Sequence, residues 1–157
     1  WAAEPSTCSS TMYNSDTFSI CVLSVSLTQE ASPFQAGIAS PNLFLEIDSS
    51  EFDELMGTNL RGAFFVAQQF CRRLVDRGQP GSIVNISSIL GQRTGSRQST
   101  YGAAKAALDQ LTRNLAMELA RSHIRVNGLA PGYFATEMNA DFFETPRGKQ
   151  YIADSFV

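Results

Sequence analysis

Residues 82–88 have the sequence SIVNISS, and this stretch decides the fold more than any other part of the chain. The run from Ser82 to Ser87 predicts a short strand, because branched apolar residues dominate it and the turn-forming sequence Gly78-Gln79-Pro80-Gly81 precedes it. Downstream, Thr100 to Arg121 predicts a long helix, because it is rich in Ala, Leu and Met. Ile124 to Ala130 then predicts a second strand.

A long helix is also predicted upstream of the SIVNISS strand. Apolar residues recur at helical spacing from Phe52 to Leu74, so the helix is expected to run from about Ser49 to Asp76. Ser50 and Asp53 have the spacing of a capping box, in which each side chain accepts a hydrogen bond from a first-turn amide. Thr145-Pro146 predicts a further helix start, since a proline in the first turn has no amide to lose.

The predicted order is helix, strand, helix, strand, joined by connections of a few residues. This alternation is typical of an α/β protein with a parallel sheet, in which crossover connections are right-handed. Ligands of such sheets bind beyond the carboxyl ends of the strands. Ser87-Ser88 follows the first strand and Pro131-Gly132 follows the second, so a site is expected at this edge of the sheet.

Residues 1–33 carry the weakest signals and are left unassigned, as a disordered or unrelated segment. The first sixty residues contain no Lys or Arg, and the first 36 contain no Gly. Ser19 to Leu27 alternates weakly and predicts one strand. The chain begins at Trp1 rather than at Met, which suggests a processed or incomplete product. Residues 34–157 are expected to form the one recognisable domain.

Composition excludes several classes of protein. With 157 residues and 43% hydrophobic content, the chain has the size and apolar content of one globular domain. A net charge of −3 argues against a nucleic-acid binder that depends on phosphate contacts. No apolar run of about 18 residues is present, so no membrane-spanning helix is expected. Three cysteines at irregular spacing favour a reduced, cytoplasmic protein over a disulfide scaffold, and they predict no metal site.

The sequence YGAAK at residues 101–105 carries the most chemistry. A spacing of four places the Tyr101 phenol and the Lys105 ammonium on one helical face. A free tyrosine has a pKa near 10, and a neighbouring ammonium is expected to lower that pKa towards neutrality. Ser88 ends the strand thirteen residues earlier, where its hydroxyl could bind a substrate oxygen. Taken alone, the Tyr–Lys pair is more often a solvated pair on a helix surface.

Several ordered motifs together resemble the short-chain dehydrogenase/reductase family over about Phe34 to Val157. The resemblance rests on five motifs, which are Ala36-Gly37-Ile38-Ala39, Thr58-Asn59-Leu60-Arg61-Gly62, the serine strand that ends at Ser88, Tyr101 with Lys105, and Arg125-Val126-Asn127 followed by Pro131-Gly132 and Thr136. Phe34-Gln35 departs from the two asparagines of the first motif. Within the family, the chain looks like the group of 3-oxoacyl-carrier-protein reductases and sugar or polyol dehydrogenases.

This resemblance implies a fold, a reaction and a set of residue roles. The fold would be part of a Rossmann-like, doubly wound parallel sheet in three layers, and the reaction would interconvert a secondary alcohol and a ketone with NAD or NADP. The implied catalytic residues are Asn59, Ser88, Tyr101 and Lys105. The implied coenzyme contacts are Ala36, Gly37, Tyr101, Lys105, Pro131, Gly132, Phe134 and Thr136, and the implied substrate contacts are Ser88, Gln98 and Tyr101. A small-molecule substrate and a homo-oligomer of the complete enzyme are implied too, whereas His123 is expected to be structural.

One expected part of the family pattern is missing. Family members begin with a strand, a glycine-rich turn and a helix whose backbone amides bind the coenzyme pyrophosphate, and this βαβ unit is missing or unrecognisable here. The residue that selects NAD over NADP belongs to the same unit. Two hypotheses therefore stay open, an NAD(P)-dependent oxidoreductase and a non-catalytic remnant with impaired coenzyme binding.

Overall fold

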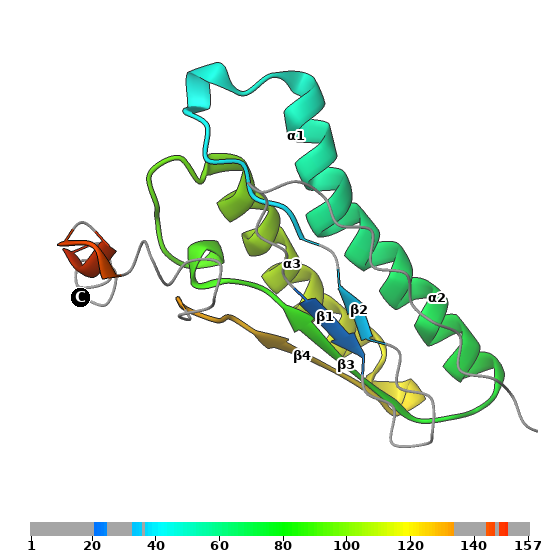
Figure 1. The fold of residues 1–157 in the computed structure, drawn as a ribbon. Coiled ribbons are helices and arrows are strands. Elements are labelled where there is room, and N and C mark those ends of the chain that lie inside the picture. The colour runs from blue at the N-terminus through cyan, green and yellow to red at the C-terminus, as the bar shows by residue number, and fades with distance from the viewer. Residues whose placement is uncertain (1–20, 25–32, 36, 134–143, 147, 151–157) are drawn as a thin grey trace, which may run out of the picture.

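The computed structural model describes residues 21–24, 33–35, 37–133, 144–146 and 148–150. Its helices and strands follow the predicted order from α1 onward (Figure 1). In chain order they are β1 (Cys21–Ser24), β2 (Pro33–Gln35), η1 (Phe44–Glu46), α1 (Ser49–Met56), the π-helical η2 (Gly57–Gly62), α2 (Ala63–Asp76), β3 (Gly81–Ile86), η3 (Ile89–Gly91), α3 (Ser99–Glu118), η4 (Ala120–Ser122) and β4 (Ile124–Leu129).

The helix predicted from Ser49 to Asp76 is present, but a π-helical turn interrupts it at η2. The predicted capping box at Ser50 is wrong. Asp48 is the N-cap, and its carboxylate accepts a hydrogen bond of 2.9 Å from the amide of Glu51. Ser50 is therefore the second residue of the helix and not its cap. At the other end Gly78 follows the last turn with φ +62°, a conformation that glycine adopts at little cost.

The sheet has the order β2-β1-β3-β4. β3 and β4 pair in parallel from Gly81↔Ile124 to Ile86↔Leu129, which confirms the predicted strand–helix–strand unit. β1 pairs antiparallel with both β2 and β3, so these two strands, for which the sequence predicted no pairing, do not continue the parallel part of the sheet. Only residues 25–32 separate β1 from β2, and a parallel connection needs a crossover of about a dozen residues or more.

Both long helices pack on the same face of β3 and β4 (Figure 1). One core cluster joins the apolar stripe of α2 to Ile83 of β3 and to Ile124 and Val126 of β4, with residues of α3 packed against it. Arg125 and Asn127 alternate with Ile124 and Val126 along β4 and are exposed. The described part of the chain therefore shows two of the three predicted layers, a sheet and the helices on one of its faces.

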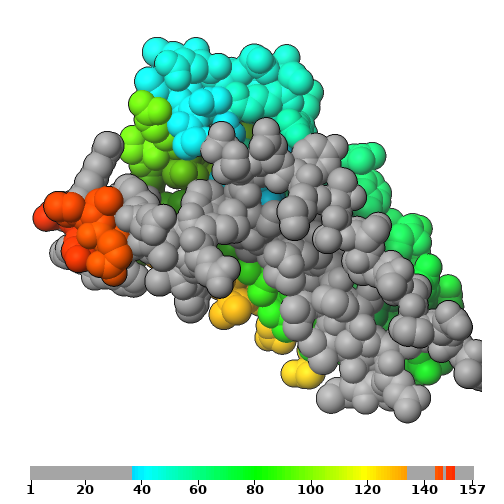
Figure 2. All heavy atoms as spheres, in the orientation of Figure 1, coloured from blue at the N-terminus to red at the C-terminus, as the bar shows by residue number. Residues whose placement is uncertain are grey.

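The remaining described segments lie at the ends of this unit. The loop before α1 and α1 itself gather at one end of the molecule (Figure 2). Glu51 of α1 holds this loop through hydrogen bonds from Ser40 and Asn42. Residues 144–146 and 148–150 are largely helical, and Thr145 Oγ1 accepts a hydrogen bond of 3.0 Å from the amide of Gly148, in agreement with the predicted helix start. None of the described helices is long and apolar enough to cross a membrane.

Candidate active site

Ser88 lies where the two parallel strands end. The amide of Ser87 donates to the carbonyl of Leu129 at 2.7 Å, and the amide of Ile89 donates to the carbonyl of Pro131 at 3.1 Å. These bonds extend the ladder beyond β3 and fix the backbone on both sides of Ser88. The side chain of Ser88 is 7% exposed, and its Oγ accepts a hydrogen bond of 3.2 Å from the amide of Leu90 as the cap of η3.

Tyr101 and Lys105 lie on the first turns of α3 and face β3. They are 4% and 1% exposed, so the surface-pair alternative is wrong for this helix. The Lys105 ammonium donates a hydrogen bond of 3.0 Å to the carbonyl oxygen of Ile86, and it lies 5.6 Å from the centre of the Tyr101 ring. The fold thus brings Ser88, Tyr101 and Lys105 together at the predicted edge of the sheet.

Burial dominates the electrostatics of the pair. It raises the pKa of Tyr101 above 10.0, and a hydrogen bond with Ser88 acts in the opposite direction. Burial also lowers the pKa of Lys105 from 10.5 to about 8, while Asp109 acts to raise it. The expectation that the ammonium lowers the pKa of Tyr101 is therefore wrong in its net direction. The ammonium lies by the ring and bonds to Ile86, whereas burial removes the water that would stabilise a phenolate.

Asn59 is buried in η2 and binds a segment that precedes it by twenty-one residues. Its Oδ1 accepts a hydrogen bond of 2.9 Å from the amide of Ile38, and its Nδ2 donates one of 2.7 Å to the Ile38 carbonyl. Ile38 and Ala39 pack in turn against a core cluster that contains Tyr101. Asn59 therefore ties the segment after β2, which begins with the buried Gly37, to the helix beside the site.

Of the other predicted contacts, some lie among the described residues and some do not. Gln98 immediately precedes α3 and is half-buried, and its Oε1 is buried with no hydrogen-bond partner. Pro131 and Gly132 follow β4 at the same edge of the sheet as Ser88. Ala36, Phe134 and Thr136 lie outside the described residues. His123 has φ +56° and its carbonyl accepts a bond of 3.2 Å from the amide of Gly81, which suits the expected structural role.

Sequence reasoning missed the polar contacts beneath the site. Asn85 and Ser87 lie on the helix-facing side of β3 and its extension, and both are buried. The Ser87 hydroxyl donates to the carbonyl of Lys105 at 3.2 Å, and Asn85 Nδ2 donates to Thr112 Oγ1 at 2.9 Å. The period of two along a strand would have placed Ile83, Asn85 and Ser87 on one face. This alternation was the sequence signal that could have identified Asn85 and Ser87 as helix-facing residues.

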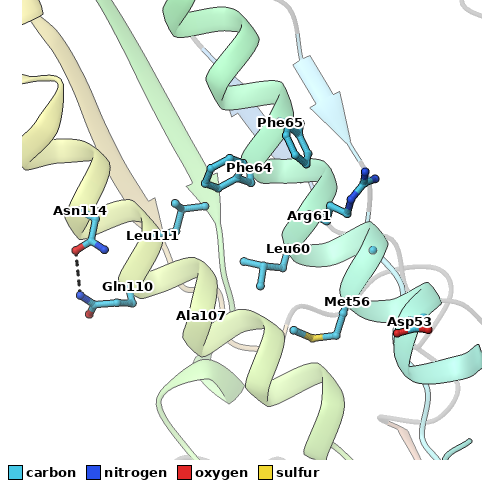
Figure 3. Close-up of a pocket in the computed structure, with 11 residues that line it drawn as sticks. Asp53, Met56, Leu60, Arg61, Phe64, Phe65, Ala107, Gln110, Leu111 and Asn114 are labelled. Atoms are coloured by element: carbon cyan, nitrogen blue, oxygen red, sulfur yellow. Dashed lines mark hydrogen bonds between the residues drawn. The ribbon is translucent and has the colours of Figure 1, made fainter. Parts of the chain in front are cut away.

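A separate groove runs between α1, η2 and α2 on one side and α3 on the other (Figure 3). It has a volume of about 700 Å³, and none of the four predicted catalytic residues lines it. Phe64 and Phe65 meet edge to face at 5.3 Å between ring centres, and the Arg61 guanidinium lies 5.0 Å from the Phe65 ring centre. The groove is lined by Asp53, Met56, Gly57, Leu60, Arg61, Phe64, Phe65, Ala107, Gln110, Leu111 and Asn114.

Comparison with known proteins agrees with this geometry. The profile of the family described as short chain dehydrogenase matches residues 34–147, which include every predicted catalytic residue. The chain belongs to the short-chain dehydrogenase family. The match begins one residue after the segment that sequence reasoning left unassigned.

Three of its relatives show how much of the family fold is present. The L-xylulose reductase of Caenorhabditis elegans is 40% identical over 119 residues, which cover 76% of this chain and 47% of that protein. A solved gluconate 5-dehydrogenase from Burkholderia cenocepacia, in complex with NADP and tartrate, matches with a TM-score of 0.69 at 34% identity, over 76% of this chain and 46% of that one. A 4-hydroxyisoleucine dehydrogenase complexed with NADH has a TM-score of 0.72 at 30% identity, over 76% of this chain and 49% of that one. The chain thus spans about half the length of the relatives it matches.

Proposed function

We propose that this chain carries the catalytic half of an NAD(P)-dependent oxidoreductase that interconverts a secondary alcohol and a ketone. The observation that carries the proposal is the buried group of Ser88, Tyr101 and Lys105 at the carboxyl end of β3. A phenol that is hydrogen-bonded to a serine and lies beside an ammonium is a proton donor for a substrate oxygen. Relatives named as an L-xylulose reductase, a gluconate 5-dehydrogenase and a 4-hydroxyisoleucine dehydrogenase support the reaction class.

The residues present fit one end of the coenzyme. An ammonium has three N–H donors, and the Ile86 carbonyl accepts from one of those on Lys105, so the others are available for ribose hydroxyls. Gly37, Pro131 and Gly132 are the proposed contacts of the nicotinamide ring, and Pro131 and Gly132 follow β4 at the same edge of the sheet. When bound, the nicotinamide would supply or accept the hydride. Residues 1–36 contain no glycine and so offer no glycine-rich turn to the pyrophosphate end.

In ketone reduction the chain's own residues would handle the proton. The Ser88 hydroxyl donates a hydrogen bond to the carbonyl oxygen and stabilises the charge that develops there. Tyr101 gives its hydroxyl proton to the same oxygen, and its raised pKa keeps that proton in place at neutral pH. Lys105 stabilises the resulting phenolate. Asn59 completes the set by fixing the backbone at Ile38 and by holding a water that relays protons between Lys105 and solvent.

Gln98 is proposed as a substrate contact. Its buried Oε1 is an acceptor that a substrate hydroxyl would satisfy, and a buried acceptor without a partner costs about 1–3 kcal/mol. This suits a hydroxylated substrate such as a sugar or polyol. We place the protein in a reducing compartment such as the cytoplasm, where the buried free thiol of Cys71 remains reduced.

We also propose that the groove of Figure 3 is covered by a second copy of the chain in the complete enzyme. Phe64 and Phe65 are 40% and 44% exposed along it, which is costly for aromatic residues on a free surface. The groove is formed by two long helices, so a two-fold axis could pair it with its own copy.

A non-catalytic remnant is the second candidate. The lack of glycine in residues 1–36 favours it for these 157 residues, because a nest of backbone amides is the usual means of holding a dinucleotide pyrophosphate. Such a chain would keep the buried Ser88, Tyr101 and Lys105 and lack turnover.

Substitution of Tyr101 by Phe separates the two candidates. In any version of the protein that turns over, loss of the hydroxyl removes the proton donor, so kcat is expected to fall at least about 100-fold, as for removal of a general acid. The assay measures oxidation of NADH and NADPH with keto sugars and simple ketones, and Tyr13→Phe, in the segment with no predicted site residue, serves as the control tyrosine variant. Turnover that Tyr101→Phe leaves unchanged excludes the proposed mechanism, and a wild-type protein that binds the coenzyme yet shows no turnover on any substrate favours the remnant.

A further inference from the structure

Two buried polar side chains of β3 and its extension bond to α3. Asn85 and Ser87 are each 1% exposed and face a helix whose neighbouring surface is apolar. Asn85 bonds to Thr112, and Ser87 bonds to the main-chain carbonyl of Lys105. Alanine would pack at either position without the cost of desolvating a polar group. The location of these two hydrogen bonds along α3 indicates what each of them does.

The bond from Ser87 is one half of a reciprocal pair. The Ser87 hydroxyl donates to the carbonyl oxygen of Lys105 at 3.2 Å, and the Lys105 ammonium donates to the carbonyl oxygen of the adjacent Ile86 at 3.0 Å. The end of β3 therefore holds Lys105 at both its main chain and its charged tip. A lysine side chain has four rotatable bonds, and its tip is well placed only when the backbone beneath it is fixed too.

The packing at Ser87 also explains why a small hydroxyl stands there. Gly91 of η3 approaches the same turn so closely that a Cβ on Gly91 would lie 2.9 Å from the carbonyl carbon of Lys105. The Lys105 turn is thus held between the β3 extension and η3. β3 and η3 contribute no titratable side chain, Tyr101 of α3 lies beside the ammonium, and Asp109 of α3 acts to raise its pKa. Other elements that pack against α3 are α1, η2 and β4, whose titratable side chains are Glu51, Asp53, Glu54, Arg61 and Arg125.

We propose that Ser87 is a positioning residue for Lys105: its hydroxyl holds the Lys105 turn of α3 against β3 and so sets where the ammonium lies beside Tyr101. The catalytic meaning of this role rests on the proposed function. The geometric role can be measured without turnover, so failure of one does not imply failure of the other.

The chain offers a matched control in Thr112. The Asn85–Thr112 bond joins the same strand to the same helix, seven residues further along α3 from Lys105. Thr112→Val removes the acceptor for Asn85 with little change of shape, and Ser87→Ala removes the donor to Lys105. Both variants lose one buried bond between β3 and α3, and only Ser87→Ala releases the Lys105 turn.

The experiment follows the two lysines of the chain by NMR, using protein labelled at lysine Cε. Lys149 is 63% exposed and serves as the internal reference, and Lys105 is expected to titrate at about 8 in the native chain. Ser87→Ala lets the ammonium reach water, so its midpoint should rise by at least about half a pH unit. Thr112→Val should leave the midpoint unchanged. Thermal unfolding of each variant reports its loss of stability beside the titration.

Two results would overturn the proposal. One is an unchanged Lys105 midpoint in Ser87→Ala, and the other is an equal shift in Ser87→Ala and Thr112→Val, which would indicate general loosening. If Ser87→Ala does not fold, Ser87→Cys replaces it, since a thiol is a weaker donor of similar size. That variant should shift the midpoint in the same direction by less, and no shift there contradicts the role of Ser87.

Discussion

Lys105 is the residue at which catalysis and stability conflict. It is buried with a pKa of about 8, against 10.5 for a free lysine. Below pH 8 the lysine is charged in both states, and the folded state carries the full cost of burying the charge. Between about 8 and 10.5 the unfolded state binds more protons than the folded state, so this lysine makes stability rise with pH in that window. Above pH 10.5 Lys105 is neutral in both the folded and the unfolded state, so no charge is buried on folding.

Replacement of Lys105 by Met should therefore stabilise the chain at neutral pH. The expected gain is on the order of 3 kcal/mol, because one pKa unit corresponds to about 1.4 kcal/mol, and it should shrink as pH rises from 8 towards 10.5. Chemical denaturation across this pH range measures the gain, with Lys149→Met as the exposed control. If Lys105→Met instead loses the same stability at every pH, burial of the ammonium does not destabilise the folded chain as predicted.

At the scale of elements, the placing of Ser88 against Tyr101 depends on how closely η3 packs on α3. Gly91 and Gly102 lie at this contact. A Cβ on Gly91 would lie 2.9 Å from the carbonyl carbon of Lys105, and a Cβ on Gly102 would lie 2.9 Å from the carbonyl oxygen of Leu90. Both neighbours are backbone atoms, which cannot rotate away as a side chain can. The two elements approach closely because glycine stands at both positions.

Gly91→Ala is expected to destabilise the chain by about 1–3 kcal/mol, as overpacking does when backbone must shift. Gly57→Ala is the matched control, since a Cβ there has nothing within 4 Å and the residue is helical. That control should be neutral or stabilising by up to about 1 kcal/mol. Denaturant midpoints of the two variants give the comparison, and equal midpoints would contradict the close packing of η3 on α3.

At the scale of the whole molecule, the proposed coenzyme contacts cover only the nicotinamide end of the dinucleotide. We expect the 157-residue chain to show no rise in melting temperature with millimolar NADH or NADPH. A ligand at 100 times its Kd would stabilise the fold by about 2.7 kcal/mol, which is readily visible. Thermal unfolding with and without each coenzyme is the measurement. A saturable rise with either one would show that the chain binds the whole dinucleotide.

The groove between α2 and α3 leads to a prediction about assembly. We expect the chain to self-associate at micromolar concentration, and Phe65→Glu to weaken that association because it places a charge in an apolar contact. Sedimentation velocity measures both. Met117→Glu is the control, because Met117 is 82% exposed on α3 and does not line the groove. A monomeric wild-type chain, or equal effects of the two variants, would count against the groove as the contact.

Local pattern was enough for the parts of this protein that depend on near neighbours in the chain. The helical periodicity from Phe52 to Leu74 and the apolar run of β3 are such patterns, as is the four-residue spacing of Tyr101 and Lys105. Each needs only the geometry of one helix or strand. The prediction of the helix N-cap was wrong, because Asp48 and Ser50 are both capping residue types two positions apart and the structure uses Asp48.

Tertiary structure alone decided the environment of the site. The bonds from Asn59 to Ile38 and from Ser87 to Lys105 join residues about twenty positions apart, and no local pattern specifies such partners. The pKa of Tyr101 follows the same logic. The sequence by itself placed an ammonium one turn away and predicted a lowered pKa, but the fold buries both groups and the pKa rises. Burial depends on every segment that packs around a side chain, and so it is settled only when the whole chain has folded.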